Sequence, residues 1–429
     1  MKNSLIKSTF ILIIGGFLTK ILGMLIKIVL TRSLTLESVG KYSLIMPTFS
    51  LLISIASLGM PVAISKLVSE DKKNNKTLLF SVIPISLIIN IVMFFIVYLL
   101  SDFISTNLLN DFDTKLGIIS IGLVLPFISI SSILRGYFFG KEKMIPHVIS
   151  NFVEDVIRLL LIYFFTPYFL TKGISYAISF IILTNIISES SSILILLLFL
   201  PKNFKLNKSD LKFNKLYLKD TLSISLPTTI SRLIGNIGYF LEPIIITNIL
   251  VYLGYTNNYI VSEYGIIEGY IMPMLLLPSF FSNAISQAII PVISRNYANN
   301  RYDIVKSKIK QGIKYSLLIG IPCTLIFMFI PNIPLKFIYN TNLGINYIKV
   351  LAPIFILYYI QSPISASIQA MGFAKECMYT TFISQILKLI VLILGCFLNI
   401  GLYGLIIAII FNIVFTTTVN IYKINKILK

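Results

Sequence analysis

The sequence of 429 residues contains little that could carry out metal or cofactor chemistry. It has one histidine (His147), three cysteines and no tryptophan, and only 12% of its residues are charged. A single histidine excludes histidine-rich metal sites and the HExxH motif, and the cysteines form no CxxC pair, so we expect no metal site. Neither a P-loop nor a GxGxxG fingerprint is present. We therefore expect no nucleotide and no other cofactor.

Apolar residues are abundant instead. They make up 56% of the chain and fall in long runs, whereas a soluble domain is about a quarter charged. One soluble core could not bury so many runs of about twenty residues. The sequence therefore predicts a multi-pass membrane protein. Its first apolar run is too long for a cleaved signal and carries Lys20 and Lys27, so we expect it to be a span.

Twelve apolar runs are long enough to cross a bilayer. They lie near residues 8–30, 42–66, 78–100, 116–139, 147–170, 174–200, 221–250, 264–293, 311–331, 345–371, 378–398 and 401–422. The expected fold class is therefore all-α, with about twelve transmembrane helices.

The distribution of basic residues predicts the orientation of these spans. The chain has 36 Lys and Arg against 17 Asp and Glu. If the N-terminus is cytoplasmic, 23 of the 36 basic residues fall in cytoplasmic segments, six in outside segments and seven within spans. Because cytoplasmic loops carry an excess of Lys and Arg, we expect both termini in the cytoplasm and the protein in the cell membrane. The positive charge then reflects topology, and nucleic acid is not an expected partner.

The longest basic segment, residues 201–220, reads as a cytoplasmic linker and divides the spans six and six. It separates an N-terminal bundle, 1–200, from a C-terminal bundle, 221–429. Corresponding spans would run in the same direction, since six is even. We therefore expect two pseudo-symmetric six-helix bundles, related by an axis along the membrane normal, with a site between them near mid-depth.

Three local matches support a duplication. At an offset of 212, TKILG in the first span falls on SRLIG, which pairs Lys20 with Arg232. PVAISK at 61–66 resembles PVISR at 291–295. At an offset of 234, KEKM falls on KECM, and Glu154 then falls on Lys388. The glycine that ends each of the strings TKILG and SRLIG is expected to permit close helix approach.

The sequence also resembles a known family. It is similar to the multidrug/oligosaccharidyl-lipid/polysaccharide exporter superfamily of MATE-like proteins, and most of all to the polysaccharide flippases typified by stage V sporulation protein B. The stretches that carry the resemblance are LTKILGMLIK (18–27), SLGMPVAISKLVSE (57–70), RGYFFGKEKMIPHVISNFVEDVIRL (135–159), SLPTTISRLIGNIGYFLEP (225–243), YGIIEGYIMPMLLLPSFFSNAISQAIIPVIS (264–294) and YYIQSPISASIQAMGFAK (358–375).

This resemblance implies a transporter that flips a lipid-linked saccharide or a peptidoglycan precursor, with a role in spore cortex synthesis. Members of this branch usually have fourteen spans against the twelve here, and in related lipid II flippases the last two helices help form a groove for the lipid tail. Those flippases also carry arginines in helices one, two and eight. Lys20 matches the first of them, Lys27 lies one place from the next, and helix eight offers Glu268 instead.

Charges inside the spans are the candidate site residues, because an ionisable residue at mid-bilayer costs at least ~2.5–3.5 kcal/mol. Lys20 and Arg232 lie at mid-depth, and Lys27 lies nearer the outer end. We expect these three cations to line a cavity and to contact the anionic part of a substrate. The alternative is that Lys20 and Arg232 only neutralise buried acids such as Glu189, Glu242 or Glu268.

The remaining candidates are charge pairs or ion-coupling groups. Glu154 and Arg158 are spaced i,i+4 and can pair on one helix face, whereas Asp155 points elsewhere and needs another partner. Pseudo-symmetry would bring Glu154 near Lys388. The acids Glu189, Glu242 and Glu268 could each carry a proton or a coupling ion. Arg135, Lys314 and His147 lie near cytoplasmic helix ends, and we expect them to be structural or interfacial.

Three functions fit such a chain to different degrees. A flippase for a polyprenyl pyrophosphate-linked saccharide needs cations in a polar path between the bundles, and its partners are that lipid, the membrane and a possible coupling ion. A cation-coupled multidrug exporter of the same fold would bind cationic substrates through acids, and the mid-depth cations argue against it. A membrane glycosyl transferase or polymerase usually has a sizeable loop with acids or histidine, and none occurs here. We therefore expect a transporter and not an enzyme.

Overall fold

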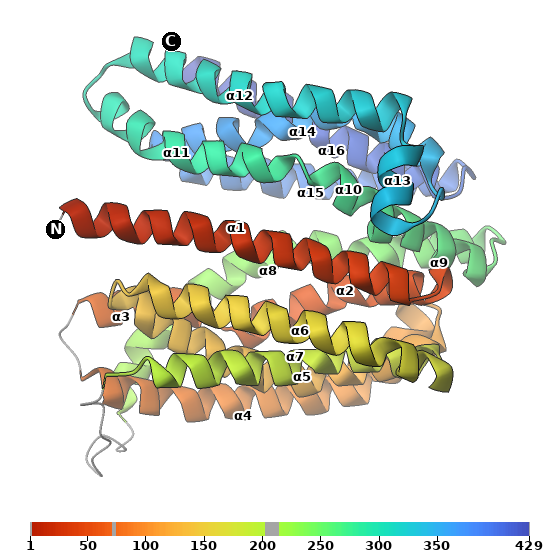
Figure 1. The fold of residues 1–429 in the computed structure, drawn as a ribbon, viewed down its shortest axis with the longest axis horizontal. Coiled ribbons are helices and arrows are strands. Elements are labelled where there is room, and N and C mark those ends of the chain that lie inside the picture. Colours follow the sequence, from red (N-terminus) through yellow and green to blue (C-terminus); the bar gives the residue numbers. More distant parts are fainter. Residues whose placement is uncertain (1, 71–73, 202–213, 429) are drawn as a thin grey trace. The chain divides into compact units, whose positions relative to one another are not determined.

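A computed structural model describes residues 2–70, 74–201 and 214–428 (Figure 1). Throughout these ranges the regular secondary structure is helical. By its internal contacts the chain divides into two compact units, Met1–Phe240 and Leu241–Lys429. Most of the expected linker, 202–213, lies outside the described residues, and residues 215–220 belong to a helix. The boundary of the halves at 201–220 stays a prediction.

The helices of the first unit begin near the N-terminus and end within α8. They are α1 (Lys2–Ser33), α2 (Leu36–Ala56), α3 (Met60–Ser69), α4 (Asn75–Asp102), the π-helix η1 (Phe103–Leu108), the 3-10 helix η2 (Phe112–Thr114), α5 (Lys115–Gly140), α6 (Met144–Lys172), α7 (Ile174–Leu198) and the first part of α8 (Lys215–Tyr252).

The second unit takes up the chain in α8 and runs to the C-terminus. Its further helices are α9 (Asn257–Gly265), the π-helix η3 (Ile266–Ile271), α10 (Met272–Leu276), α11 (Ser279–Ala298), α12 (Tyr302–Phe329), α13 (Asn332–Tyr339), α14 (Ile345–Ala370), α15 (Ala374–Phe397) and α16 (Tyr403–Ile427).

These helices account for the twelve expected runs. Eight helical segments in the described residues, one of them α2 with α3, are long and apolar enough to span a membrane, and two more strongly bent pairs, in α8 and in α9–α11, raise the number to ten. The other two runs are α1 and α6, with 32 and 29 residues. At about 1.5 Å per residue each is longer than the ~30 Å hydrocarbon layer. α6 is less apolar because Glu154, Asp155 and Arg158 lie within it.

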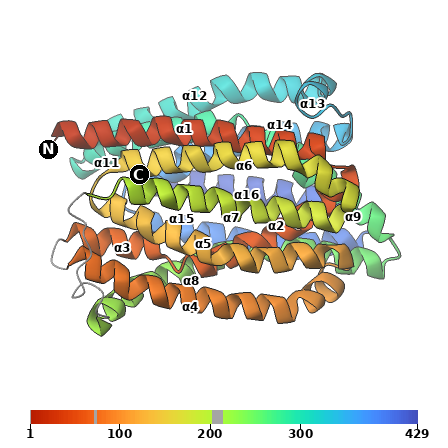
Figure 2. The same ribbon diagram turned by 60° about the horizontal axis from the view of Figure 1, so that its bottom comes forward.

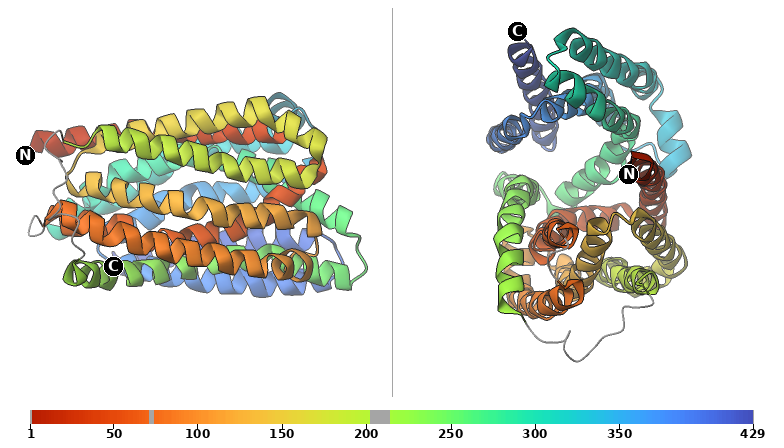
Figure 3. Two further views of the ribbon diagram at one scale, coloured as in Figure 1. Left: turned by 90° about the horizontal axis from the view of Figure 1, so that it is seen from below. Right: turned by 90° about the vertical axis from the view of Figure 1, so that its left-hand side faces the viewer.

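In the first unit, α5 is the central helix. α2, α3, α4 and α7 pack against it, while α1 packs on α6 and α6 on α7 (Figure 3). Small residues let these helices approach closely. A Cβ added at Gly136 would lie 2.9 Å from the Pro61 carbonyl oxygen, and the hydroxyl oxygens of Ser120 and Ser179 lie 2.5 Å apart. α5 therefore positions its neighbours through direct backbone proximity and hydroxyl bonds.

In the second unit, α14 takes the corresponding place. α11, α12 and α16 pack against it, and α15 packs closely on α16 (Figure 2). A Cβ added at Gly395 would lie 2.9 Å from the Cα of Gly404, so α15 and α16 touch through their backbones. The range of α5 shifted by the offset of 234 overlaps α14. The two central helices thus occupy equivalent places in the internal repeat.

The second span of each half is broken. In the first unit the chain turns through Leu58 (φ 46°) and Gly59 (φ 57°), and Pro61 stands in the first turn of α3. In the second unit a 46° bend separates Asn257–Leu276 from Ser279–Ala298. The matched strings KEKM (141–144) and KECM (375–378) do not lie at the same point of their helices. KEKM lies at the turn between α5 and α6, whereas KECM lies inside the first turn of α15. The repeat is therefore shifted by about one helical turn there.

Candidate functional site

The strongest polar feature of the first unit is the arginine–carboxylate cluster, formed by Arg135, Glu154, Asp155, Arg158 and Glu189. Arg135 of α5 places its Nη2 atom 2.5 Å from Glu154 Oε2 and 3.3 Å from Glu189 Oε2. Arg158 places its Nη2 atom 2.7 Å from Glu154 Oε1. The predicted pair of Glu154 and Arg158 is confirmed, and the carboxylate of Glu154 lies between two guanidinium groups.

The carboxylates of this cluster need their ion pairs because they are buried. Glu154 is 7% exposed and Glu189 is 6% exposed, and an uncompensated buried charge is strongly destabilising. Hydroxyl groups of α7 complete the cluster, because Arg135 donates to Ser192 Oγ at 3.0 Å and Arg158 donates to Ser188 Oγ at 3.2 Å. The cluster therefore joins α5, α6 and α7 through a connected set of hydrogen bonds.

One expectation about this region is wrong. Asp155 needs no separate partner, since its Oδ1 atom lies 3.8 Å from Arg158 Nη1, one turn along α6. Arg135 has the structural role that was one of the two expected for it, because its side chain is only 18% exposed and it is ion-paired with Glu154 and Glu189. α5 and α6 form a hairpin around the short turn at 141–143, which brings Arg135 and Glu154 together. Treating each charge by its depth alone missed this relation.

The second unit contains a simpler ion pair. Lys388 of α15 donates to Glu242 Oε2 of α8, and Glu242 is only 1% exposed. Glu242 therefore has its counter-ion within its own unit. The same holds for Glu154, which is paired with Arg135 and Arg158. The predicted interaction of Glu154 with Lys388, in at least one state of the protein, stays a prediction.

The mid-depth cations behave differently. Lys20 and Arg232 are exposed, and no carboxylate in the described part of the chain forms an ion pair with either of them. Glu189 and Glu242 are paired with other cations, so these two acids are not the counter-ions that the alternative interpretation required. Lys20 and Arg232 are thus exposed charges near the middle of α1 and α8.

The space around these two cations is open. A Cβ added at Gly16, Gly23 or Gly235 meets no atom of the first unit within 4 Å. Gly16 and Gly23 flank Lys20 at helical spacing on one face of α1, and Gly235 follows Arg232 by one turn. Within the described part of the first unit, neither Gly23 nor Gly235 lies at a close helix contact. These glycines leave room beside each cation instead.

The other predicted residues are less exposed. Lys27 is partly buried in α1, and Glu268 is partly buried in the π-helix η3. π-helical turns are frequent at functional sites. Among the described residues no group of three or more His, Cys, Asp or Glu is arranged to hold a metal ion.

Sequence reasoning missed a polar groove in the second unit. This cavity of about 330 Å³ lies between α11 and α14, and its walls consist mainly of uncharged amides and hydroxyls. Ser362 Oγ donates to Asn283 Oδ1 at 2.7 Å, and the Ser286 and Ser362 hydroxyl oxygens lie 2.7 Å apart. Its lining residues are Ser279, Asn283, Ser286, Gln287, Ile290, Tyr358, Gln361, Ser362, Ser365, Ala366 and Gln369. A ligand rich in hydroxyl groups would find donors and acceptors here.

A second missed feature ties one end of the first unit together. Lys41 of α2 is buried, and its Nζ atom lies 2.8 Å from Glu37 Oε1, 2.5 Å from Asp113 Oδ2 and 3.7 Å from Asp111 Oδ2. Ser175 of α7 donates to the other oxygen of Asp113 at 3.1 Å. Burial raises the pKa of Asp111, and the nearby Lys41 opposes this shift. Lys41 thus joins α2, the segment before α5 and the start of α7.

Comparison with known proteins identifies the family. The model of the family described as "Polysaccharide biosynthesis protein" matches residues 5–297, and the MatE model matches residues 243–394. Together the two matches extend from the first helix into α15. They agree with the resemblance that the sequence itself indicates.

Individual relatives agree. The chain is 32% identical to stage V sporulation protein B of Bacillus subtilis (strain 168), over 100% of this chain and 85% of the relative. It is 21% identical to the lipid II flippase MurJ of the same organism, over 91% of this chain and 77% of the relative.

Solved structures show the same fold. An inward-facing multidrug resistance MATE family transporter matches with a TM-score of 0.74 at 16% identity, over 95% of this chain and 94% of that chain. A lipid II flippase MurJ in an inward closed conformation matches with a TM-score of 0.70 at 17% identity, over 96% and 87%. The predicted fold of about twelve transmembrane helices is confirmed. The chain is a multi-pass membrane protein of the polysaccharide biosynthesis family, and it has the fold of the MATE transporter and MurJ structures.

Proposed function

We propose that this transporter moves a lipid-linked saccharide, of the polyprenyl pyrophosphate type, from the inner to the outer leaflet of the cell membrane by alternating access. A pyrophosphate-linked sugar cannot cross hydrocarbon unaided, because desolvating its charges and hydroxyls costs too much. The relationship to a protein named as a lipid II flippase supports a substrate of this chemical kind. Cytoplasmic positions of both termini are part of the proposal.

One observation favours an anionic substrate over a cationic one. The strongly buried carboxylates Glu154, Glu189 and Glu242 are each paired with an Arg or Lys, so they are not free to bind a cationic drug. By contrast Lys20 and Arg232 are exposed at mid-span. Lys suits a phosphate as a compact charge, and Arg can bind it with two parallel hydrogen bonds.

The polar groove between α11 and α14 supports the saccharide part of the proposal. Its walls offer the amides of Asn283, Gln287 and Gln361 with several serine hydroxyls. Amides and hydroxyls both donate and accept hydrogen bonds, as sugar hydroxyls do. An uncharged polar surface of this kind would lower the desolvation cost of the sugar without attracting ions.

The charges also suggest how movement would be driven. The cell interior is negative, so outward movement of an anionic head group is favourable by ~2.3 kcal/mol per charge per 100 mV. The arginine–carboxylate cluster has three carboxylates and two arginines, so the binding of one proton or one monovalent cation would neutralise it. A membrane potential, alone or with such an ion, would then supply the driving force.

The names of two relatives extend the proposal to the cell wall. Stage V sporulation protein B is named for sporulation, and the lipid II flippase is named for its lipid II substrate. We therefore place the substrate among peptidoglycan precursors and the process in the synthesis of spore cortex.

A reconstituted flipping assay tests the proposed function. Proteoliposomes would contain a fluorescent polyprenyl pyrophosphate-linked sugar, and an impermeant quencher would report its appearance in the other leaflet. Transport of the lipid, accelerated by a potential that drives anions in the assayed direction, is the expected result. Expulsion of a cationic dye with no movement of the lipid would support the cation-coupled exporter instead. That alternative remains because the fold is shared with multidrug transporters.

A further inference from the structure

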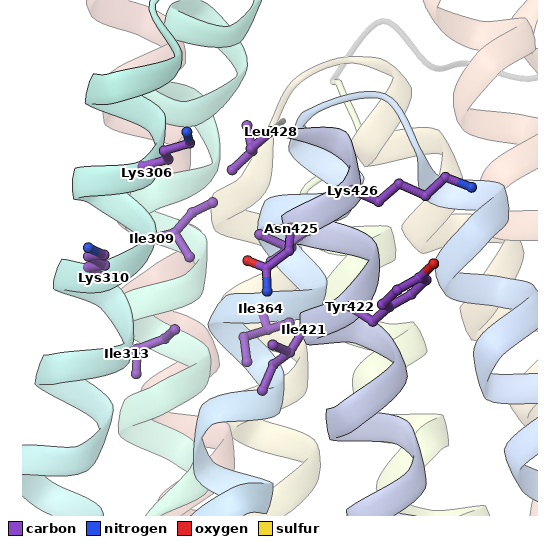
Figure 4. A pocket seen from close by; sticks show the side chains of 11 residues that line it. Lys306, Ile309, Lys310, Ile313, Ile364, Ile421, Tyr422, Asn425, Lys426 and Leu428 are labelled. Carbon is purple, nitrogen blue, oxygen red and sulfur yellow. The ribbon is translucent and has the colours of Figure 1, made fainter.

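The second unit has another cavity, whose lining does not include the ion pair of Lys388. We call it the lysine groove. It has a volume of about 710 Å³ and lies between α12, α14 and α16 (Figure 4). Its lining residues are Lys306, Ile309, Lys310, Ile313, Ile364, Ile421, Tyr422, Ile424, Asn425, Lys426 and Leu428. Its size falls within the range of ligand pockets, about 300–1,000 Å³.

The walls of the lysine groove are amphipathic. Lys306, Ile309, Lys310 and Ile313 follow the i, i+3, i+4, i+7 spacing, which places them on one face of α12. Isoleucines of α14 and α16 form the apolar wall. In Figure 4 the amide of Asn425 points into the space between α12 and α16, whereas Lys426 and Tyr422 point to the other side of α16. Lys306, Lys310 and the amide of Asn425 therefore border the apolar wall that the isoleucines form.

The two lysines are available to a ligand. Lys306 and Lys310 are exposed, and neither forms an ion pair with a carboxylate in the described residues. Lys308, on another face of the same helix, donates to Gln311 at 2.9 Å and does not line the groove. Of these neighbouring lysines of α12, Lys306 and Lys310 therefore line the groove and Lys308 does not.

The position of Lys310 along α12 places the groove at a membrane surface. Lys310 lies 19 residues before the end of the helix at Phe329, which is about 28 Å at ~1.5 Å per residue. The intervening stretch holds one further charge, Lys314, and is otherwise mostly apolar. Since the hydrocarbon layer is ~30 Å thick, Lys310 lies near the polar boundary when Phe329 lies at the opposite one. The basic residues assign this end to the cytoplasmic side, where anionic lipids give the leaflet a negative surface.

A neighbouring hollow continues in the direction of the membrane interior. It has a volume of about 440 Å³ and shares Lys310 and Ile313 with the lysine groove. Beyond them it is lined by Lys314, Leu317, Leu318 and Ile321 of α12. A ligand with its phosphate at Lys310 could therefore lay a hydrocarbon chain along an apolar path.

We propose that the lysine groove binds an anionic phospholipid of the cytoplasmic leaflet. The phosphate contacts Lys306 and Lys310, the head group reaches Asn425, and one acyl chain follows Ile313 toward Ile321. This lipid is a bound component of the transporter and is separate from the transported substrate. The binding of the lipid is inferred from the groove and does not depend on what the protein transports, whereas the leaflet rests on the cytoplasmic termini of the proposed function.

The test measures lipid binding by the purified full-length chain in detergent. Phosphatidylglycerol and the neutral phosphatidylcholine are titrated separately, and bound lipid is counted by native mass spectrometry. Phosphatidylglycerol is expected to bind more tightly. The variant Lys306→Gln/Lys310→Gln should weaken its binding about 25-fold and Lys310→Gln alone about 5-fold, since each surface lysine contributes ~1 kcal/mol to an anionic lipid. Phosphatidylcholine binding should be unchanged.

Two further variants separate charge from shape. Lys308→Gln/Lys375→Gln removes the same charge from exposed or partly exposed sites outside the groove, and it should bind phosphatidylglycerol normally. Ile421→Trp fills the groove and should weaken the binding of both lipids. Equal losses in the lysine pair and its control would overturn the proposal, because net charge alone would then explain binding. If the double variant does not fold, the single Lys310→Gln variant provides the same comparison.

Competition identifies the ligand. Inorganic phosphate in excess should fail to displace phosphatidylglycerol, because it lacks the acyl chain. Displacement by phosphate would show a simple anion site and would overturn the proposal. Displacement by an equal concentration of undecaprenyl pyrophosphate would show that the groove holds the transported lipid, and it would reject the separate phospholipid site while leaving the proposed function intact.

Discussion

The guanidinium of Arg135 in α5 lies 2.5 Å from the carboxylate of Glu154 in α6. This contact links two helices of one hairpin, and the second oxygen of Glu154 is held by Arg158. Each partner is buried enough that its charge depends on the other. Breaking this contact therefore affects both the packing of the first unit and any movement that requires α5, α6 and α7 to stay together.

Glu154→Gln should destabilise the protein by about 3 kcal/mol, because it leaves two buried or half-buried arginines without their shared counter-ion. The thermal midpoint of the purified protein measures this loss. Asp155→Asn is the matched control, since Asp155 contacts Arg158 only at 3.8 Å. Its loss should stay under about 1 kcal/mol, as for weakly coupled pairs. Equal losses for the two substitutions would contradict the central place of Glu154 in the cluster.

Lys388 and Glu242 should be energetically coupled. Lys388→Gln leaves the buried Glu242 unpaired, and Glu242→Gln leaves the partly buried Lys388 unpaired. The double variant removes both charges, so it should be more stable than the sum of the single losses predicts. An interaction energy of about 1–3 kcal/mol in a double-mutant cycle is expected for contacting residues. Additive unfolding energies would contradict the ion pair.

The sequence also predicts communication between Glu154 and Lys388. Glu154→Gln and Lys388→Gln should each impair transport more than the double variant does. The measurement is the flipping rate, with the stability of each variant as control. Since both residues have partners within their own units, such a result would report a second conformation in which they meet. Strictly additive losses of rate would show that they do not communicate.

Much of the fold could be predicted because it depends on local, periodic features. The length of each apolar run, and the even number of spans, follow from bilayer thickness and the placement of lysines. The pair of Glu154 and Arg158 follows from helical spacing in the same way. The repeat also predicts that the fourth span corresponds to the tenth. In the structure these spans are α5 and α14, and each lies at the centre of its unit.

The charge network could not be predicted as fully, because its partners lie on different helices. Nothing in the spacing of Arg135, Glu154 and Glu189 shows that three helices bring them together. The same is true of Lys41, whose partners Asp111 and Asp113 are about seventy residues away in sequence. Glycine was ambiguous for a related reason: Gly136 marks close packing, whereas Gly23 marks an open face, and a glycine alone does not show which helices lie beside it.

Lys41→Gln should destabilise the end of the first unit where α2, α5 and α7 meet. The change leaves Glu37, Asp111 and Asp113 close together without their shared cation. A loss of about 3 kcal/mol is expected for a buried partner, with faster hydrogen exchange at residues 109–114. Lys115→Gln is a suitable control, because the side chain of its partner Asp102 is 63% exposed. Equal behaviour of the two variants would show that the Lys41 contacts contribute little.

The orientation of the spans is tested by cysteine accessibility in intact cells. Single cysteines at residues 105–113 should react with an impermeant reagent from outside, and those at 205–215 should react only after the membrane is opened. The background would lack the native Cys323, Cys377 and Cys396. Labelling of both segments from the same side would contradict cytoplasmic termini and with them the assignment of the lysine groove to the inner leaflet.

The flipping rate should depend on the positive charge of Lys20. Lys20→Arg should retain much of the flipping rate, because it keeps a cation on the open face of α1, whereas Lys20→Ala should lose most of it. Arg232→Lys should cost more than Lys20→Arg, since it gives up planar contact with two phosphate oxygens. The flipping assay with a pyrophosphate-linked sugar measures each rate, and the amount of protein in the membrane is the control.

These cations should be dispensable for folding, which separates a binding role from a structural one. Both side chains are exposed, and no carboxylate in the described residues forms an ion pair with either. Removing them therefore strands no buried acid, and the thermal midpoint of Lys20→Ala/Arg232→Ala should stay within a few degrees of the parent. A normal transport rate in this double variant would reject both residues as contacts of the pyrophosphate. A large loss of stability would show instead that they neutralise acids. Lys20 and Arg232 would then no longer support an anionic substrate.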